Sequence, residues 1–230
     1  ILYSTNGNAV KNKKTFKITS EDITLFDTSR NRKIPITIYE PQTIKLKKQK
    51  IIIFSHGYFA NTEGANKEYS YLTNYLASKG YFVVSVQHEL SSDSLIPDKG
   101  IPQIVRRPFW ERGVDNILFV INELKKKYYE LNHNRIILIG HSNGGDMSML
   151  FGKKYPNLID KIISLDSRRM PFPRTKQPKI YSLRSSDQTA DEGVIPTIEE
   201  QKKFDIKIIK LKNTKHSNMD NSGTKGQKDE

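Results

Sequence analysis

The sequence predicts an α/β fold, in which a mostly parallel, doubly wound sheet follows an antiparallel N-terminal hairpin. Apolar residues make up only 36% of the 230 residues, but they gather in short dense runs such as 51–54 and 161–165. Strands that are buried on both faces of a parallel sheet have this pattern. These runs alternate with segments of helical periodicity, as expected for a parallel sheet covered by helices.

The predicted elements follow one another without an internal repeat or a long linker. After a polar lead, residues 15–19 and 34–39 alternate apolar and polar side chains, as half-exposed antiparallel strands do, and residues 27–32 between them are turn formers. Further strands are predicted at 51–54, 81–86, 135–139, 161–165, 179–183 and 206–211. Helices are predicted at 68–79, 106–127, 145–151 and 198–203.

Length and composition limit the class of protein. We expect residues 1–230 to form one domain with polar, poorly ordered ends at 1–14 and 217–230. No apolar stretch is long enough to span a membrane. The chain has no cysteine, which excludes disulfides and thiolate metal sites. It begins at Ile1, which fits either a trimmed chain or a mature exported (periplasmic or secreted) form.

The formal charge of +13 raises the question of a polyanionic partner. The lysines are spread along the chain, and their densest cluster is Lys45, Lys47, Lys48 and Lys50 in a predicted loop. No basic patch with interleaved aromatic residues matches a nucleic-acid motif, so no nucleic-acid partner is predicted. Peripheral contact with an anionic membrane remains as a secondary trait. The sequence does not indicate an oligomeric state.

The most informative motif is Gly-His-Ser-Asn-Gly at 140–144, directly after the apolar run 135–139. A Gly-x-Ser-x-Gly that ends a buried strand and opens a helix is the nucleophile elbow of α/β-hydrolases. Such a turn is strained and needs residues without bulk beside the serine. The alternative is a plain strand–turn–helix corner. The context favours the elbow, so Ser142 is the predicted nucleophile.

A serine hydroxyl needs a base to take its proton and a third group to orient that base. In this architecture the chain order is serine, acid, histidine, and His216 is the one histidine downstream of the acids. Asp166 and Asp187 each follow a predicted strand, and either strand end can bring a carboxylate to His216. Asp191 is a weaker third candidate. The residues alone leave the acid open.

The predicted oxyanion hole needs two backbone N–H donors. One belongs to Asn143, after the nucleophile, and the other to Tyr58, where Gly57 lets the chain turn. Four aromatic residues either line an acyl or alcohol pocket or pack in the core: Tyr58, Phe59, Phe109 and Trp110. The other histidines are assigned local roles, His56 and His88 beside the site, His141 in the elbow and His133 in solvent. No metal-ligand spacing or cofactor motif is present, so neither group is predicted.

Several motifs together carry a family resemblance. They are Phe-Ser-His-Gly at 54–57, the run 76–84, Gly-His-Ser-Asn-Gly-Gly at 140–145, Ser-Leu-Asp-Ser at 164–167, Met-Pro at 170–171 and His-Ser-Asn at 216–218. With them the chain, from about 51 to 220, resembles the platelet-activating factor acetylhydrolase group of α/β-hydrolases and the related dienelactone-hydrolase-like and chlorophyllase-like serine esterases. In that group the Leu-Asp segment supplies the acid, which the resemblance carries to Asp166. The alternative stays Asp187, because residues 183–187 look like the post-strand acid of the wider superfamily.

The resemblance implies an α/β-hydrolase fold and a serine esterase. The short stretch 166–178 has no room for the cap domain that many lipases insert there, so an open site is expected. The polar tail after His216 stands where such folds pack an amphipathic helix, and a truncated end would explain it. We expect short-acyl or phospholipid-type acetyl esters as substrates. Alternatives are a peptidase or polyester hydrolase of the same fold and, in a different class, a non-catalytic binder of anionic lipid or another polyanion.

Overall fold

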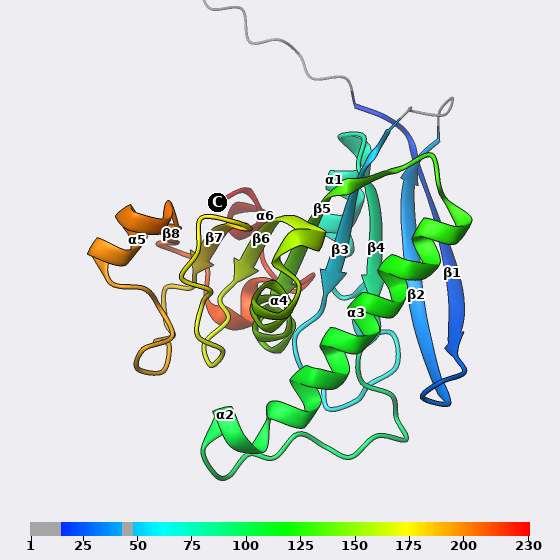
Figure 1. Ribbon diagram of the computed structural model, residues 1–230. Coiled ribbons are helices and arrows are strands. Elements are labelled where there is room, and N and C mark those ends of the chain that lie inside the picture. The colour runs from blue at the N-terminus through cyan, green and yellow to red at the C-terminus, as the bar shows by residue number, and fades with distance from the viewer. Residues whose placement is uncertain (1–14, 43–47) are drawn as a thin grey trace, which may run out of the picture.

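One eight-stranded sheet organises the part of the chain that the computed structural model describes, residues 15–42 and 48–230 (Figure 1). Segments 1–14 and 43–47, with Lys45 and Lys47 of the basic cluster, lie outside the described residues. The strands are β1 (Ile18–Asp27), β2 (Arg32–Pro41), β3 (Lys50–Ser55), β4 (Phe82–Val86), β5 (Asn132–His141), β6 (Ile159–Leu165), β7 (Lys179–Arg184) and β8 (Lys207–Lys210). The helices are α1 (Ser70–Ser78), α2 (Pro102–Val105), α3 (Arg107–Lys127), α4 (Asn143–Lys154), α5 (Ile198–Phe204) and α6 (Lys225–Asp229), with short 3-10 turns η1 (Ala65–Lys67), η2 (Pro156–Leu158) and η3 (His216–Asn218).

The strand order is β1-β2-β4-β3-β5-β6-β7-β8. The strand β2 pairs antiparallel with both β1 and β4, whereas the pairs from β4 through β3 to β8 are parallel. The predicted antiparallel hairpin and mostly parallel sheet are therefore confirmed. Because the chain order reverses at β3, the loops after β3 and β5 diverge at the carboxyl edge of the sheet, where α/β folds bind ligands.

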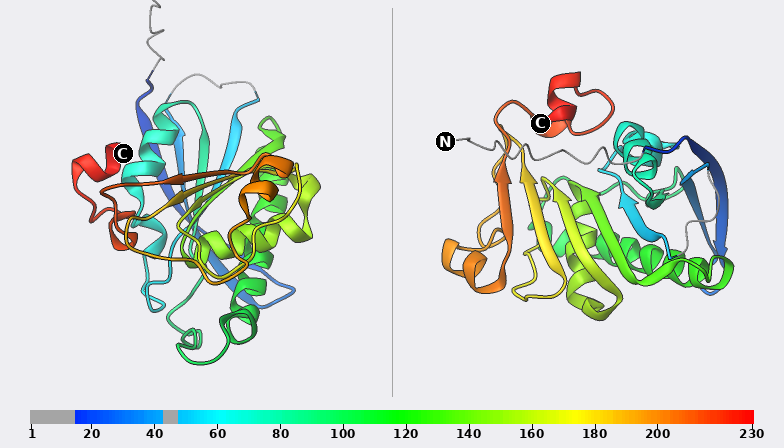
Figure 2. Two further views of the ribbon diagram at one scale, coloured as in Figure 1. Left: turned by 90° about the vertical axis from the view of Figure 1, so that its left-hand side faces the viewer. Right: turned by 90° about the horizontal axis from the view of Figure 1, so that it is seen from above.

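Helices cover both faces of the sheet, as the view from above shows (Figure 2). The helices α3 and α4 lie on one face, and α1 with the C-terminal segment lies on the other. Alternate residues of β3 enter the two apolar clusters: Ile51 and Ile53 face α3 and α4, while Ile52 and Phe54 face α1. Burial on both sides explains why this strand is apolar without a break.

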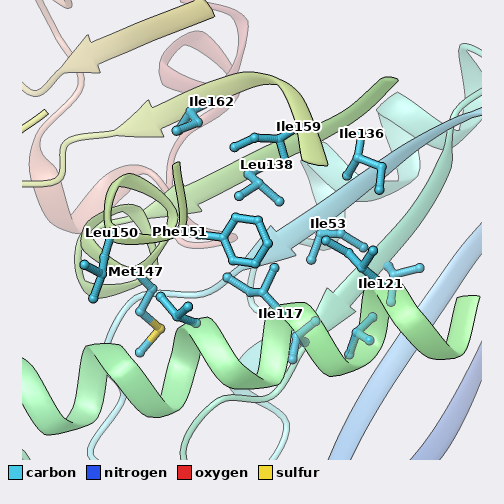
Figure 3. Packing of buried hydrophobic residues seen from close by; sticks show 14 of the residues in the cluster. Ile53, Ile117, Ile121, Ile136, Leu138, Met147, Leu150, Phe151, Ile159 and Ile162 are labelled. Atoms are coloured by element: carbon cyan, nitrogen blue, oxygen red, sulfur yellow. The ribbon is translucent and has the colours of Figure 1, made fainter. Parts of the chain in front are cut away.

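The larger apolar cluster fixes α3 and α4 on the sheet. Figure 3 shows Ile117 of α3 and Phe151 of α4 meeting over Leu138 of β5. All three side chains are almost completely shielded from solvent. Full burial of an apolar side chain of this size contributes about 2–3 kcal/mol. This packing holds α4, and with it the motif at 140–144, against the centre of the sheet.

One prediction about the ends of elements is wrong. The first strand covers Ile18–Asp27 rather than 15–19, because its partner β2 pairs with it over ten residues. The C-terminal segment 217–230, whose poor order remains a prediction, includes α6, which Thr224 and Gln227 open with a capping box. Its Glu230 carboxylate accepts hydrogen bonds from Lys212 N and Thr214 Oγ1 at 2.6 and 2.7 Å. Within the described residues no separate cap domain is evident, as predicted.

Candidate active site

The motif at 140–144 forms a tight turn between β5 and α4. Ser142 has φ 48° and ψ −115°, a backbone conformation that L-residues rarely adopt. Backbones crowd this turn: a Cβ atom on Gly140 would lie 2.3 Å from Gly144 O, and one on Gly144 would lie 2.3 Å from Ser55 O. The glycines therefore let the turn close against β3. The serine stands half-buried at the start of α4.

The structure brings Ser142, His216 and Asp166 together. His216 Nε2 lies 3.1 Å from Ser142 Oγ, and His216 Nδ1 lies 2.6 Å from Asp166 Oδ2. The His216 side chain keeps 18% of its surface exposed, whereas that of Asp166 has none. Serine, imidazole and carboxylate thus form one hydrogen-bonded row that opens to solvent at the serine end. This is the geometry that a nucleophile, its base and an orienting acid require.

The Asp166 carboxylate is buried yet charged. Asp166 directly follows β6 with a positive φ of 54°, and its carboxylate accepts hydrogen bonds from the backbone N–H and the hydroxyl of Ser185 at 3.1 and 2.7 Å. Arg184 Nη2 lies 2.8 Å from Oδ1 as an ion pair. Burial alone would raise the pKa of Asp166, but the hydrogen bonds from His216 and Ser185 and the charge of Arg184 outweigh it and lower the pKa to about 2.

The other two candidate acids do not reach the imidazole ring. Asp187 Oδ1 accepts the backbone N–H of His216 at 2.8 Å, from an exposed position. It therefore fixes the loop that carries the histidine and not the ring itself. Asp191 Oδ2 instead accepts a hydrogen bond from Gln103 Nε2 at 3.3 Å.

A second hydrogen-bonded row runs beneath the first through His141. The N–H of Gly57 donates to Tyr69 Oη, which lies 2.7 Å from His141 Nδ1, and His141 Nε2 lies 3.1 Å from His216 O. Burial lowers the pKa of His141 to about 3, so the ring is neutral, accepts at Nδ1 and donates at Nε2. His141 therefore has a local, structural role, as predicted: its ring links the loop after β3 to the loop that carries His216.

The two predicted oxyanion donors lie at the same edge of the sheet. The N–H of Asn143 occupies the first position of α4, where a helix offers no acceptor of its own. In the described part of the chain, the N–H of Tyr58 also lacks an acceptor, while its hydroxyl accepts from Ile96 N at 3.1 Å. Their role in an oxyanion hole remains a prediction.

Sequence reasoning missed a buried polar network behind Asn143. The Asn143 amide accepts from Trp110 Nε1 at 2.9 Å and donates to Glu89 Oε1 at 3.0 Å. Trp110 is fully buried in the core, so it does not line a pocket. Burial raises the pKa of Glu89 to about 7, although the charge of Arg112 opposes this. The polar run 87–89 at the end of a buried strand was the available signal.

The remaining histidines have no metal-binding arrangement. His56 is buried, and its Nε2 accepts the backbone N–H of His88 at 3.1 Å, which places both residues beneath the loop after β3. His133 is half-buried rather than solvated, with Nε2 2.8 Å from Tyr128 O. Across residues 15–42 and 48–230, no group of three or more metal-ligating side chains is placed to hold an ion. In the same residues, no helix combines the length and apolar character needed to cross a membrane.

Comparison with known proteins identifies the family. The BD-FAE family model matches residues 36–172, more than half of the chain. The chain belongs to the BD-FAE family. This family consists of α/β-hydrolase esterases, so the BD-FAE chain is, at a general level, a carboxylic ester hydrolase. The predicted membership of the α/β-hydrolase superfamily is confirmed. None of the curated proteins matches the sequence.

Solved structures show the same fold at low sequence identity. A putative dienelactone hydrolase from Klebsiella pneumoniae superposes on this BD-FAE chain with a TM-score of 0.64 and 13% identity, over 93% of this chain and 95% of that one. A CE1 ferulic acid esterase from Anaeromyces mucronatus gives 0.63 and 12%, over 90% of each chain. A thermostable esterase gives 0.57 and 18%, with 84% of this chain covering only 53% of that one. The chain thus spans about half the length of the thermostable esterase.

Proposed function

We propose that this protein is a serine esterase that cleaves short-acyl carboxylic esters through an acyl-enzyme. Ser142 Oγ attacks the ester carbonyl while His216 Nε2 takes its proton, and His216 then returns that proton to the leaving alcohol. Water, activated by the same imidazole, attacks the acyl-enzyme and releases the acid. Asp166 holds the ring in the tautomer with Nδ1 protonated and stabilises the imidazolium that forms.

One observation carries this proposal: the continuous row from Ser142 Oγ through His216 to Asp166 Oδ2, with distances of 3.1 and 2.6 Å. The low pKa of Asp166 keeps its carboxylate charged at neutral pH, so the carboxylate can stabilise the His216 imidazolium that forms during the reaction. The backbone N–H groups of Asn143 and Tyr58 are the proposed donors to the oxyanion. Each donor of this kind is worth roughly 3–4 kcal/mol of transition-state stabilisation.

Labelling with a fluorophosphonate, followed by mass spectrometry of the peptides, tests the nucleophile. We expect one adduct, on Ser142, and none on the Ser142→Ala variant. Ser92→Ala is a matched control, because Ser92 is exposed on the loop after β4 and should leave the labelling unchanged. Folded wild-type protein without an adduct on Ser142 would contradict the proposal.

Acyl-chain preference tests the substrate class. The comparison uses p-nitrophenyl acetate, butyrate and octanoate, for which we expect the highest kcat/KM with acetate. This expectation is supported by the part of the chain that the structure describes, in which no separate cap domain is evident to enclose a long acyl chain. A maximum at octanoate would contradict the short-acyl assignment while leaving the serine mechanism intact.

A further inference from the structure

The arginines of this protein fall into two groups. All ten lie within the described residues, and six form ion pairs with carboxylates: Arg30, Arg32, Arg107, Arg112, Arg174 and Arg184. Of the four that form none among residues 15–42 and 48–230, Arg135 is exposed on β5. The other three, Arg106, Arg168 and Arg169, are half-buried. A half-buried cation without a counterion is costly, so their common location is informative.

Arg169 lies close to the candidate nucleophile. The Asp146 N–H donates to Ser142 O at 3.0 Å within the first turn of α4. The Asp146 carboxylate in turn accepts the backbone N–H groups of Arg169 and Met170 at 3.0 and 2.9 Å. The backbone of Arg169 is therefore tied to the first turn of α4, the helix that follows Ser142.

Arg106 is linked through Trp110 to Asn143, the residue after Ser142. Its carbonyl accepts the N–H of Trp110 at 3.1 Å, and the Trp110 indole donates to the side chain of Asn143, the neighbour of Ser142. Gln103 Nε2 donates to Arg169 O at 3.1 Å, which ties α2 to the loop after β6. Figure 1 shows α2 and the start of α3 beyond the carboxyl ends of β3 and β4. These contacts place Arg106 and Arg169 on one rim.

Arg168 completes this rim on the side of the acid loop. Its guanidinium donates to Gln188 Oε1, and its carbonyl accepts the N–H of Asp191 at 2.9 Å. Its charge also reaches His141 in the elbow, whose pKa it helps to lower. The charge of Arg106 interacts with those of Arg168 and Arg169, so the three side chains form one cluster beside the elbow and the loop of Tyr58.

Positive charge exceeds negative charge at this rim. Burial, followed by repulsion from Arg169 and Arg168, lowers the pKa of Arg106. Two carboxylates face the cluster. Burial raises the pKa of Asp146 to about 6, and the other, Asp191, is the acceptor for Gln103. Neither carboxylate forms an ion pair with the three guanidiniums in the described residues. The guanidiniums are therefore partly desolvated cations that can bind an anion.

We propose that Arg106, Arg168 and Arg169 form an anion-binding rim, and that the ester hydrolysed at Ser142 carries a carboxylate or phosphate on its acyl or alcohol part. The planar guanidinium fork matches both anions in a bidentate manner. The backbones of all three arginines are hydrogen-bonded, and the Arg168 guanidinium is also held by Gln188. This inference rests on the proposed esterase function, because it names the substrate class of the same site.

The test uses the whole protein and compares the hydrolysis of negatively charged esters with that of related neutral esters. Mono-p-nitrophenyl succinate is compared with p-nitrophenyl acetate, 4-acetoxybenzoate with its methyl ester, and 4-acetoxyphenyl phosphate with phenyl acetate. In wild type we expect a high ratio of kcat/KM for the charged ester to kcat/KM for its neutral partner. For at least one pair, this ratio should fall at least about tenfold in Arg106→Gln and in Arg169→Gln, because each variant loses a hydrogen bond to a charged group. Added salt should lower the wild-type ratio, because ions screen the rim.

Two further variants keep the result interpretable. Arg106→Lys preserves the positive charge and should keep most of the preference for charged over neutral esters. A loss of preference in Arg106→Gln can then be assigned to the missing charge and not to misfolding. Arg135→Gln removes an unpaired arginine from an exposed position on β5 and should leave both kcat/KM values unchanged. Thermal melting of each variant checks that it is folded.

Three outcomes would overturn the rim. The first is a ratio that stays the same in Arg106→Gln and Arg169→Gln for all three pairs. The second is a ratio that falls equally in Arg135→Gln. The third is loss of binding to phosphatidylglycerol vesicles in the rim variants without any change in the ester ratios, which would assign the arginines to membrane contact. In each case, hydrolysis of p-nitrophenyl acetate that depends on Ser142 would leave the esterase proposal standing, whereas no hydrolysis of any ester would overturn both.

Discussion

Glutamine in place of Glu89 should make the protein more stable at alkaline pH and less sensitive to pH. The Glu89 side chain is buried behind Asn143, and burial raises its pKa from the ordinary 4.5 to about 7. Glutamine keeps an oxygen that can accept from Asn143 Nδ2, now 3.0 Å from Oε1. It removes only the group that titrates.

The sign follows from proton uptake. Between pH 4.5 and about 7, the unfolded chain has an ionised Glu89 and the folded protein a protonated one, so folding takes up a proton. The free energy of unfolding therefore falls as pH rises through this window and levels off above it. Since one pKa unit corresponds to ~1.36 kcal/mol, the wild type loses about 3 kcal/mol that the variant keeps.

Urea unfolding at pH 4.5 and pH 8, followed by the fluorescence of the single tryptophan, Trp110, measures this difference. We expect the gap in unfolding free energy between wild type and Glu89→Gln to change by about 3 kcal/mol from one pH to the other. Glu40→Gln, at an exposed position on β2, is the matched control and should show no such change. A Glu89→Gln gap that stays constant to within about 0.5 kcal/mol would refute the reasoning.

Three more predictions concern the same site. Asp166→Asn should lower kcat by roughly 10⁴-fold because the imidazole loses its orienting charge. Asp187→Asn keeps an acceptor for the backbone N–H of His216 and should lower kcat less than about tenfold. Steady-state kinetics with p-nitrophenyl acetate measures both, and a larger loss in Asp187→Asn would reassign the acid. Ser142→Gly should unfold at a higher urea concentration than Ser142→Ala, by about 1 kcal/mol, because glycine relieves the positive φ; equal midpoints would show that the turn is not strained. Trp110→Phe should lower the free energy of unfolding by about 2–3 kcal/mol, because it removes the indole hydrogen bond and creates a small cavity. Chemical denaturation followed by circular dichroism measures this, and coincident curves for wild type and variant would contradict it.

Much of the fold could be predicted because its strands are buried on both faces. The apolar run 51–54 lies within β3 (Lys50–Ser55), and the periodicity at 106–127 matches α3 (Arg107–Lys127) to one residue. The first strand could not be delimited in this way, since β1 is an edge strand that is largely exposed. Pairing with β2, and not its own composition, decides where it ends. The four-residue helix α2 is too short to show a helical period.

Only the site residues that a motif or the order of residues along the chain identifies could be predicted. The elbow and the order of residues selected Ser142 and His216, but two aspartates remained. Both contact His216, Asp166 at the ring and Asp187 at the backbone N–H, so the choice depends on side-chain direction. The polar run 87–89 marked the end of a buried strand, but it did not point to Asn143, because that partner of Glu89 comes from a distant segment.

The segment that carries His216 has a consequence for inactivation by heat. Ser142 and Asp166 are fixed at the ends of central strands, whereas His216 follows the edge strand β8 and is tied to the body through polar contacts, such as Asn221 N to Glu68 O at 2.7 Å. Local opening requires less free energy than global unfolding at such a site. Activity should therefore vanish on warming before the sheet melts, and amide exchange should be fastest in the C-terminal segment. Since the chain has no cysteine, a single engineered disulfide between this segment and α1 would have no competing thiols and would raise the temperature of inactivation more than that of melting.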